Sequence, residues 1–185
     1  FLYQQSSIRD ALVAALTLHI FNAHCERVTM GNIAQTVNVL QALVLTDPDS
    51  DRMLLTPTYH VFEMFKVHHD ATLLPLNLSC DEYSYGDQAI PGLSASASRD
   101  GAGRVHLTLA HGNPHRSADV RLDVRGMALR SVRGRVLTAG EMTAHNTFDA
   151  PDTVRPQELA SVEAQDNTAT LTLPPMSVVA LELEA

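Results

Sequence analysis

The chain has 185 residues, 45% of them hydrophobic and 18% charged, a composition that supports one substantial core or two modest ones and excludes a disordered charged tail. Its formal net charge is −8, and its thirteen Lys and Arg residues are scattered, which argues against a nucleic-acid-binding surface. The longest apolar stretch, residues 11–23, contains Thr17, His19 and Asn22 and is too polar and too short to span a membrane.

The start of the sequence and its two cysteines bear on its cellular context. Residue 1 is Phe, and no pattern of basic segment, apolar segment and cleavage site follows, so we expect this to be an internal starting point rather than a signal peptide. Cys25 and Cys80 could form one disulfide by number, but they fall in different predicted domains. We expect unpaired thiols and a cytoplasmic protein.

The first predicted element is a helix over residues 8–24. Ser7 with Asp10 three residues later is typical of a capping box at a helix start. The expected buried side follows at helical spacing and consists of Ile8, Leu12, Ala15 or Leu16, and Ile20 or Phe21.

A short buried strand is predicted over residues 27–32, "RVTMGN". The stretch after it, 33–44, fits either a helix or an extended segment, and periodicity does not decide between them. Residues 28–41 carry no charged side chain, and the amides Asn32, Gln35 and Asn38 lie among their apolar residues. If this stretch is interior, each amide needs a hydrogen-bond partner, which could be either protein or ligand.

A second helix is predicted over residues 57–69, after a turn at 47–51. Thr56 is expected to be its N-cap and Pro57 its first residue. The expected buried side consists of Tyr59, Phe62, and Phe65 or Lys66. The end of an α/β repeat is expected to show this order of elements: helix, strand, amide-bearing stretch, loop and helix.

From residue 70 onward the hydrophobic period changes to that of short strands separated by turns, which predicts an antiparallel β-sandwich. The predicted strands lie in "TLLPLNL", "LSASASR", "RVHLTLA", "ADVRLDVRG", "LRSVRGRVL", "TATLTL" and "SVVALELE". Residues 99–104, "RDGAGR", are expected to form a hairpin turn, and residues 145–157 an ordered surface loop. The fold class is therefore α/β over 1–69 followed by all-β over 70–185.

No catalytic or metal-binding motif stands out from the residue types alone. The nine histidines lack an HExxH pattern, and Cys25 follows a predicted helix beside Glu26, which would not favour its thiolate. Glu63 and Glu141 are best explained as solvated surface carboxylates. We expect no metal and no cofactor.

Three stretches carry a resemblance to a known family. "LYQQSSIRDALVAALTLHIFNAHCERVTMGNIAQTVNVLQALVLTD", "LLTPTYHVFEMFKVHHDATLLPL" and "NTFDAPDTVRP" closely resemble the C-terminal third of α-L-arabinofuranosidases of glycoside hydrolase family 51. The resemblance covers nearly all of the chain and is strongest over residues 2–76. It implies the last unit of a (β/α)₈ TIM barrel followed by a jelly-roll-like antiparallel β-sandwich.

By this resemblance, residues 8–24 would be the seventh barrel helix, 27–32 the eighth strand and 57–69 the eighth helix. Active sites of such barrels lie at the carboxyl ends of the strands, where "NIAQTVN" would emerge. In the family, the Gln of this segment hydrogen-bonds the arabinofuranose in the subsite before the scissile bond, and the matching residue is Gln35. Asn32 and Asn38 are expected to be structural.

The resemblance also implies what this chain lacks. The two glutamates that the family uses for retaining hydrolysis belong to sequence that would precede Phe1, so no catalytic residue is expected here. The expected partners are an arabinofuranosyl oligosaccharide from arabinan or arabinoxylan, the missing barrel sequence, and further copies, since hexamers occur in the family. The alternative is a stand-alone carbohydrate-binding sandwich, for which Tyr83 and Tyr85 are the candidate sugar-stacking residues.

Overall fold

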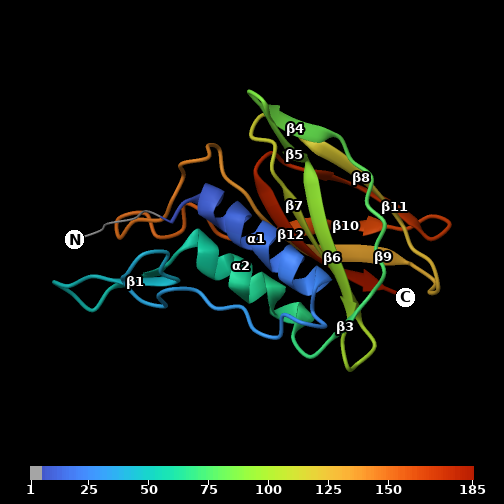
Figure 1. Cartoon of the computed structure of the whole chain (residues 1–185), viewed down its shortest axis with the longest axis horizontal. Coiled ribbons are helices and arrows are strands. Elements are labelled where there is room, and N and C mark those ends of the chain that lie inside the picture. Colours follow the sequence, from blue (N-terminus) through green and yellow to red (C-terminus); the bar gives the residue numbers. More distant parts are fainter. Residues whose placement is uncertain (1–5) are drawn as a thin grey trace.

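The computed structural model describes residues 6–185, in which two helices lie side by side against one face of a β-sandwich (Figure 1). The elements are α1 (Ile8–Ala23), β1 (Val44–Thr46), β2 (Met53–Leu55), α2 (Pro57–Phe65), η1 (Lys66–His68), β3 (Thr72–Leu73), β4 (Glu82–Tyr85), β5 (Gln88–Pro91), β6 (Leu93–Arg99), β7 (Val105–His111), β8 (Ala118–Asp123), β9 (Ser131–Leu137), β10 (Gln157–Glu163), β11 (Thr168–Leu173) and β12 (Ser177–Glu184).

Helix α1 confirms the first predicted element. The Asp10 carboxylate accepts hydrogen bonds from the Ser7 backbone N–H at 2.7 Å and from the Ser7 hydroxyl at 2.8 Å. The helix therefore begins where the capping box predicts, and it ends at Ala23. Its buried residues are Ile8, Ala11, Leu12, Ala15 and His19, whereas Ile20 is exposed.

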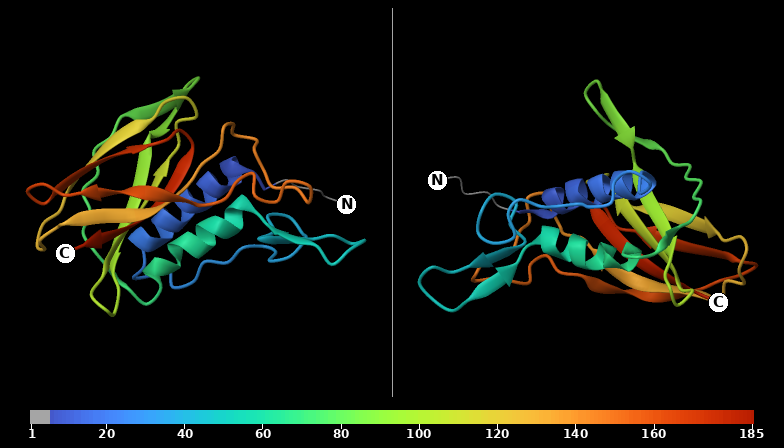
Figure 2. Two further views of the ribbon diagram at one scale, coloured as in Figure 1. Left: turned by 180° about the vertical axis from the view of Figure 1, so that it is seen from behind. Right: turned by 60° about the horizontal axis from the view of Figure 1, so that its bottom comes forward.

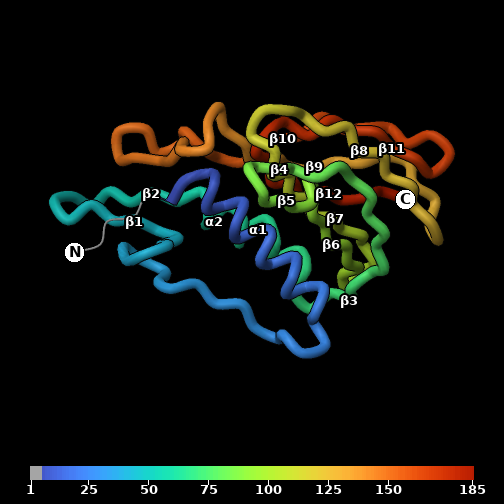
Figure 3. Tube along the Cα trace, turned by 45° about the horizontal axis from the view of Figure 1, so that its top comes forward, coloured from blue at the N-terminus to red at the C-terminus, as the bar shows by residue number. Residues whose placement is uncertain are grey.

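The strand predicted over residues 27–32 does not form. Residues 28–33 have no regular secondary structure, and Met30 is 71% exposed. A covered strand needs backbone partners on its edges, and none of the strands within residues 6–185 pairs with this stretch. The following residues are not helical either, because they fold into an irregular loop that leads to β1. In Figure 3 this segment runs as a light-blue tube outside the helices.

Helix α2 begins as predicted, since the Thr56 hydroxyl accepts a hydrogen bond from Tyr59 N at 3.3 Å and Pro57 is the first residue. Its last turn is the 3₁₀ helix η1. The expected buried side was wrong except for Phe65: Tyr59 and Phe62 are half-buried and Lys66 is exposed. The buried residues of α2 are Pro57, Thr58, Val61, Met64 and Phe65, of which the last three belong to the core shared with α1 and the sheet.

The sandwich is built on a six-stranded antiparallel sheet in the order β10-β9-β12-β7-β6-β3. One face packs under the helices, and the two-stranded sheet of β8 and β11 lies against the other, which Figure 2 shows from two further sides. Every residue of β7 is buried because both faces of this strand are covered. Leu107 and Leu109 belong to the core between the sheets, and Ala110 belongs to the core beneath the helices.

All seven segments predicted to hold strands contain one, so the antiparallel sandwich is confirmed. The hairpin turn at 99–104 is also confirmed: Asp100 N donates to Arg104 O at 3.0 Å, and Gly103 has a φ of +85°. The alternation pattern missed strand β10 and the β4–β5 hairpin. This hairpin stands away from the body of the molecule in the right panel of Figure 2.

The change from helix to strand falls where the sequence predicts it, since η1 ends at His68 and β3 begins at Thr72. The division into domains over 1–69 and 70–185 stays a prediction. In this chain the two parts share a core, because Leu12 and Met64 of the helices belong to the same apolar cluster as Val178 of the sheet. No helix within residues 6–185 is long and apolar enough to cross a membrane.

Candidate functional site

The amides Asn32, Gln35 and Asn38 are not interior in this chain, because all three are exposed. They differ in whether their side chains form hydrogen bonds within the protein. Asn38 is fastened at its side chain, whereas the side chains of Asn32 and Gln35 make no hydrogen bond to any described residue. Asn38 therefore has a protein partner for its amide, whereas the amides of Asn32 and Gln35 have none among the described residues.

Asn38 is the structural amide. Its Nδ2 donates to the Thr46 hydroxyl at 2.7 Å, and its Oδ1 accepts from Thr46 N at 2.7 Å. Its φ is +61°, a left-handed conformation that Asn tolerates better than most residues. This contact agrees with the expected structural role and fixes the loop to strand β1.

Gln35 lies at the start of the loop that Asn38 fixes. Its backbone N donates to Val39 O at 3.1 Å, so the main chain is held while the side chain is left exposed. An amide side chain carries both donors and an acceptor, which suits it to hydroxyl groups of a sugar. The geometry leaves this amide available to a ligand.

The surface around this loop is apolar. Val37, Val39 and Leu40 are each more than a third exposed, and Val13 and Ile20 on the outer side of α1 are 58% and 59% exposed. Beside them a cavity of about 320 Å³ lies between α1 and residues 31–33. Exposed apolar groups gathered in this way are typical of a surface that packs against further protein.

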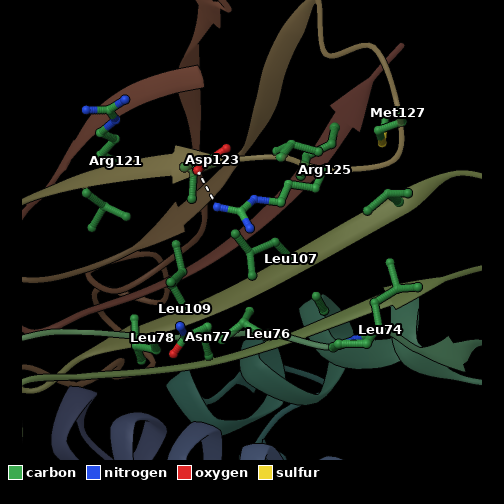
Figure 4. A pocket seen from close by; sticks show the side chains of 18 of the residues that line it. Leu74, Leu76, Asn77, Leu78, Leu107, Leu109, Arg121, Asp123, Arg125 and Met127 are labelled. Atoms are coloured by element: carbon green, nitrogen blue, oxygen red, sulfur yellow. Dashed lines mark hydrogen bonds and ion pairs between the residues drawn. The ribbon is translucent and has the colours of Figure 1, made fainter. Parts of the chain in front are cut away.

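The sandwich has a second cavity, of about 280 Å³, shown in Figure 4. Leu74, Leu76 and Leu78 lie along one side, facing Leu107 and Leu109 of β7. The charged side chains Arg121, Asp123 and Arg125 lie at its opposite rim, where Arg125 and Asp123 form an ion pair at 3.4 Å. None of the side chains that line this cavity is aromatic, so it lacks a stacking platform for a sugar ring.

A more polar cavity of about 390 Å³ lies at the base of the β4–β5 hairpin. Tyr83 lines it together with Asp81, Glu82 and Asp119, whereas Tyr85 lies outside and is 82% exposed. The two tyrosines considered for sugar binding therefore do not form one platform.

The two glutamates considered as carboxylates with a chemical role have ordinary surroundings. Glu63 on α2 binds Arg135 of β9 at 2.8 Å and Lys66 at 3.0 Å, which ties the helix to the sheet. Glu141 is exposed. Glu63 is thus an interface ion pair rather than the fully solvated carboxylate expected.

Sequence reasoning missed a polar network buried beneath the helices. The Thr108 hydroxyl of β7 lies 3.0 Å from His19 Nε2 and 2.8 Å from His68 Nε2, while the Nδ1 atoms of these rings contact Ser94 and Ser98 of β6. Burial lowers the pKa of His19 to about 3 and that of His68 to about 4. The signal in the sequence was the serine alternation of "LSASASR", which places several hydroxyls on one face of a strand.

These histidines do not form a metal centre. Within residues 6–185 there is no group of three His, Cys, Asp or Glu side chains placed to hold one ion. Cys25 and Cys80 are free, as predicted, and both are exposed.

Comparison with known proteins identifies the family. The family model described as the α-L-arabinofuranosidase C-terminal domain matches residues 1–177. An intracellular exo-α-L-arabinofuranosidase of Bacteroides ovatus is 40% identical over 184 residues, which cover 99% of this chain and 35% of that protein. An intracellular exo-α-(1→5)-L-arabinofuranosidase of Bifidobacterium longum is 26% identical and is covered to 32%.

The solved structures agree. The GH51 arabinofuranosidase from Xanthomonas axonopodis pv. citri has a TM-score of 0.95 and 46% identity, over all of this chain and 37% of that one. The arabinose complex of the Thermotoga maritima α-L-arabinofuranosidase has a TM-score of 0.86 at 22% identity, which shows a shared fold. The chain spans about a third of the length of the relatives it matches. It belongs to the family of α-L-arabinofuranosidase C-terminal domains.

Proposed function

We propose that this chain is the C-terminal part of a retaining exo-α-L-arabinofuranosidase that releases terminal α-L-arabinofuranosyl residues from arabinan or arabinoxylan oligosaccharides. The chain contributes the last unit of a (β/α)₈ barrel, with α1 and α2 as its last two helices, and the β-sandwich that packs on them. Residues 27–32 become the eighth strand when neighbouring barrel strands pair with both of their edges.

The observation that supports the proposal is that the backbone of Gln35 is held in place while its side-chain amide is exposed. Its main chain is held by the loop, and its amide is exposed and makes no hydrogen bond to any described residue. In a closed barrel this amide lies at the carboxyl end of the eighth strand, on the side where such enzymes bind substrate. There it donates to and accepts from hydroxyls of the arabinofuranosyl ring before the scissile bond.

The reaction itself depends on groups outside this chain. In a retaining glycosidase one carboxylic acid protonates the leaving oxygen while a carboxylate roughly 5 to 5.5 Å away attacks the anomeric carbon. Gln35 holds the sugar in the orientation that this attack requires. We propose a cytoplasmic location, in line with the intracellular relatives, and assembly of several copies into a homo-oligomer.

The test uses the complete enzyme and an aryl α-L-arabinofuranoside. Gln35→Ala should lower kcat/KM by an amount corresponding to about 1 to 3 kcal/mol of lost transition-state binding. Gln88→Ala, an exposed glutamine on the distant β4–β5 hairpin, is the matched control and should leave kcat/KM unchanged. The 185-residue chain alone should show only background hydrolysis, and equal activity of wild type and Gln35→Ala would remove Gln35 from the site.

One observation favours the alternative of a carbohydrate-binding sandwich, namely that Tyr83 lines the polar cavity beside the β4–β5 hairpin. Calorimetric titration of the chain with arabinoxylan fragments distinguishes the two proposals. Binding that disappears in Tyr83→Ala and persists in Gln35→Ala would support the module; absence of binding by the wild-type chain would reject it.

A further inference from the structure

The sandwich is joined to the Gln35 loop by a continuous series of contacts that begins in the long loop before β10. Asn146 is 6% exposed, and its Nδ2 donates to Leu55 O at 2.8 Å and to Val154 O at 3.0 Å. Its Oδ1 accepts from Val154 N at 2.7 Å. Both ends of this amide are therefore used, and they fix the last residue of β2 to the sandwich loop.

A second contact joins the same two parts at the surface. The guanidinium of Arg52, just before β2, binds Asp47 at 2.7 Å and lies 3.7 Å from the Asp149 carboxylate. It also lies over the ring of Phe148, 5.4 Å from its centroid. The hairpin formed by β1 and β2 is thus attached to the sandwich loop both through a buried amide and through an exposed cation.

Strand β1 carries this attachment on to the Gln35 loop. It pairs with β2 in the register Val44 to Leu55 and Thr46 to Met53. Thr46 then holds the Asn38 side chain through the two bonds of 2.7 Å, and Asn38 N donates to Val44 O at 3.0 Å.

The loop between Asn38 and Gln35 is closed on itself. Gln35 N donates to Val39 O at 3.1 Å, and Thr36 O accepts from the backbone N–H groups of Leu43 and Val44, each at 3.0 Å. Because residues 36 and 38 are both tied to β1, the backbone of Gln35 has little freedom to move independently of that strand. The hairpin therefore sets the point from which the Gln35 side chain extends.

We propose that Asn38 is a positioning residue for Gln35, and that the β1–β2 hairpin and the sandwich loop around Asn146 form the brace that holds it. The inference rests on the proposed substrate-binding role of Gln35. It gives the "NTFDAPDTVRP" segment a role in the site although none of its residues needs to touch the sugar. A misplacement of about an ångström at a positioning contact is enough to slow an enzyme considerably.

The experiment is a double-mutant cycle in the complete enzyme, with steady-state kinetics on an aryl α-L-arabinofuranoside. Asn38→Ala should lower kcat/KM roughly 10-fold, and in the Gln35→Ala background it should have almost no further effect, because it acts through Gln35. The matched control is Asn167→Ala. Asn167 also has a left-handed φ, of +60°, and a side-chain bond to a backbone N–H, at 2.9 Å, but it lies in a turn of the sandwich.

Two further variants at Asn38 separate the loss of its side-chain bonds to Thr46 from other effects of the substitution. Asn38→Gly accommodates the positive φ but lacks the side-chain bonds, so it should be as impaired as Asn38→Ala. Asn38→Asp retains an acceptor for Thr46 N and should recover part of the activity. Arg52→Ala, which loosens the sandwich end of the brace, should lower kcat/KM about threefold, again only when Gln35 is present.

The outcomes distinguish the two proposals. Full activity of Gln35→Ala would overturn both. A clear loss in Gln35→Ala, with Asn38→Ala and Asn38→Gly no worse than Asn167→Ala, would leave the proposed function standing and overturn the positioning role. Effects of Asn38→Ala and Gln35→Ala that simply multiply would also overturn it, because they would show that Asn38 acts independently of Gln35.

Discussion

Strand β7 and the segment 28–41 are both rich in apolar side chains, yet the strand is buried and the segment is exposed. Every residue of β7 is buried, because β6 and β12 pair with its two edges and the helices and β8–β11 cover its two faces. The segment 28–41 has no charged side chain, and nearly all of it is exposed. An apolar sequence therefore indicates a need for burial, but the presence of backbone partners decides whether a strand forms.

The difference in packing between the buried sheet and the exposed segment can be tested first by replacing a glycine in each with alanine. A Cβ added to Gly134 on β9 would collide with Ala180 O and lie 2.9 Å from Leu181 Cα, both backbone atoms of the neighbouring strand. Neither can move without disturbing the centre of the sheet, so Gly134→Ala should destabilise the chain by about 4 kcal/mol. Urea unfolding measures this.

Gly31, in the exposed segment, is the matched control. A Cβ there would meet the Phe21 side chain at 3.2 Å, and this half-buried ring borders the cavity beside α1, which gives it room to shift. Gly31→Ala should change the free energy of unfolding by less than about 0.5 kcal/mol. Equal effects at the two glycines would mean that the sheet is less tightly constrained than its geometry indicates.

The next effect in size is a pH dependence located in the network beneath the helices. His19 faces His68 of η1, Phe65 of α2 and the hydroxyls of β6 and β7, and His68 in turn faces His106. Burial lowers the pKa of both rings, so the unfolded chain binds protons that the folded chain excludes. Their contribution is complete above about pH 6.5 and is lost progressively as the pH falls towards 4, by on the order of 3 kcal/mol.

Urea unfolding between pH 7 and pH 4 would measure this slope, and the double variant His19→Gln/His68→Gln should flatten it. Asp100, which lies 3.4 Å from His106, does not titrate in this window, because hydrogen bonds from Arg104 and neighbouring backbone groups outweigh its burial and lower its pKa to about 2. An unchanged slope in the double variant would assign the acid sensitivity to other groups.

The third prediction concerns the amide that joins the sandwich loop to β2. Asn146→Ala would leave Leu55 O and both backbone polar groups of Val154 without their side-chain partner in a buried site. A loss of about 2 kcal/mol is expected in urea unfolding. Asn113→Ala, which removes side-chain bonds to the backbone of an exposed turn, is the control and should cost clearly less. Similar losses would show that water replaces the bonds of Asn146.

The features that could be predicted from the sequence are those that depend on residues close together in the chain. The capping box at Ser7, the N-cap at Thr56 and the Asp–Gly turn at 99–104 were predictable because each depends on residues adjacent in the chain. The sandwich was predictable because its strands alternate. The failures depend on distant neighbours: residues 27–32 lack a pairing strand, and the buried side of α2 is set by how α1 and the sheet meet it.

The candidate site follows this rule too. Gln35 was predicted through a resemblance, and its amide is exposed in the structure, while its role at the site stays a proposal. The contacts of Asn146 and Asn38 could not be predicted from the sequence. Asn146 binds a residue far away along the chain, and Asn38 lies in an irregular loop. Irregular loops have no periodicity from which such contacts could be predicted.

The smallest effect is expected at Met30, and it would show most directly what the exposed segment is for. Met30 is 71% exposed, so Met30→Ser in the 185-residue chain should move the thermal midpoint by less than about 2 °C. In the complete enzyme, where we propose that residues 27–32 form a barrel strand covered on both faces, the same substitution removes buried apolar surface and should cost about 2 kcal/mol. Met53→Ser is the control, since Met53 is 61% exposed on the β1–β2 hairpin and should have a small effect in both proteins. Thermal midpoints of the four variants decide the matter: a small effect of Met30→Ser in both proteins would show that the segment stays outside any core, and the eighth-strand assignment would then be wrong.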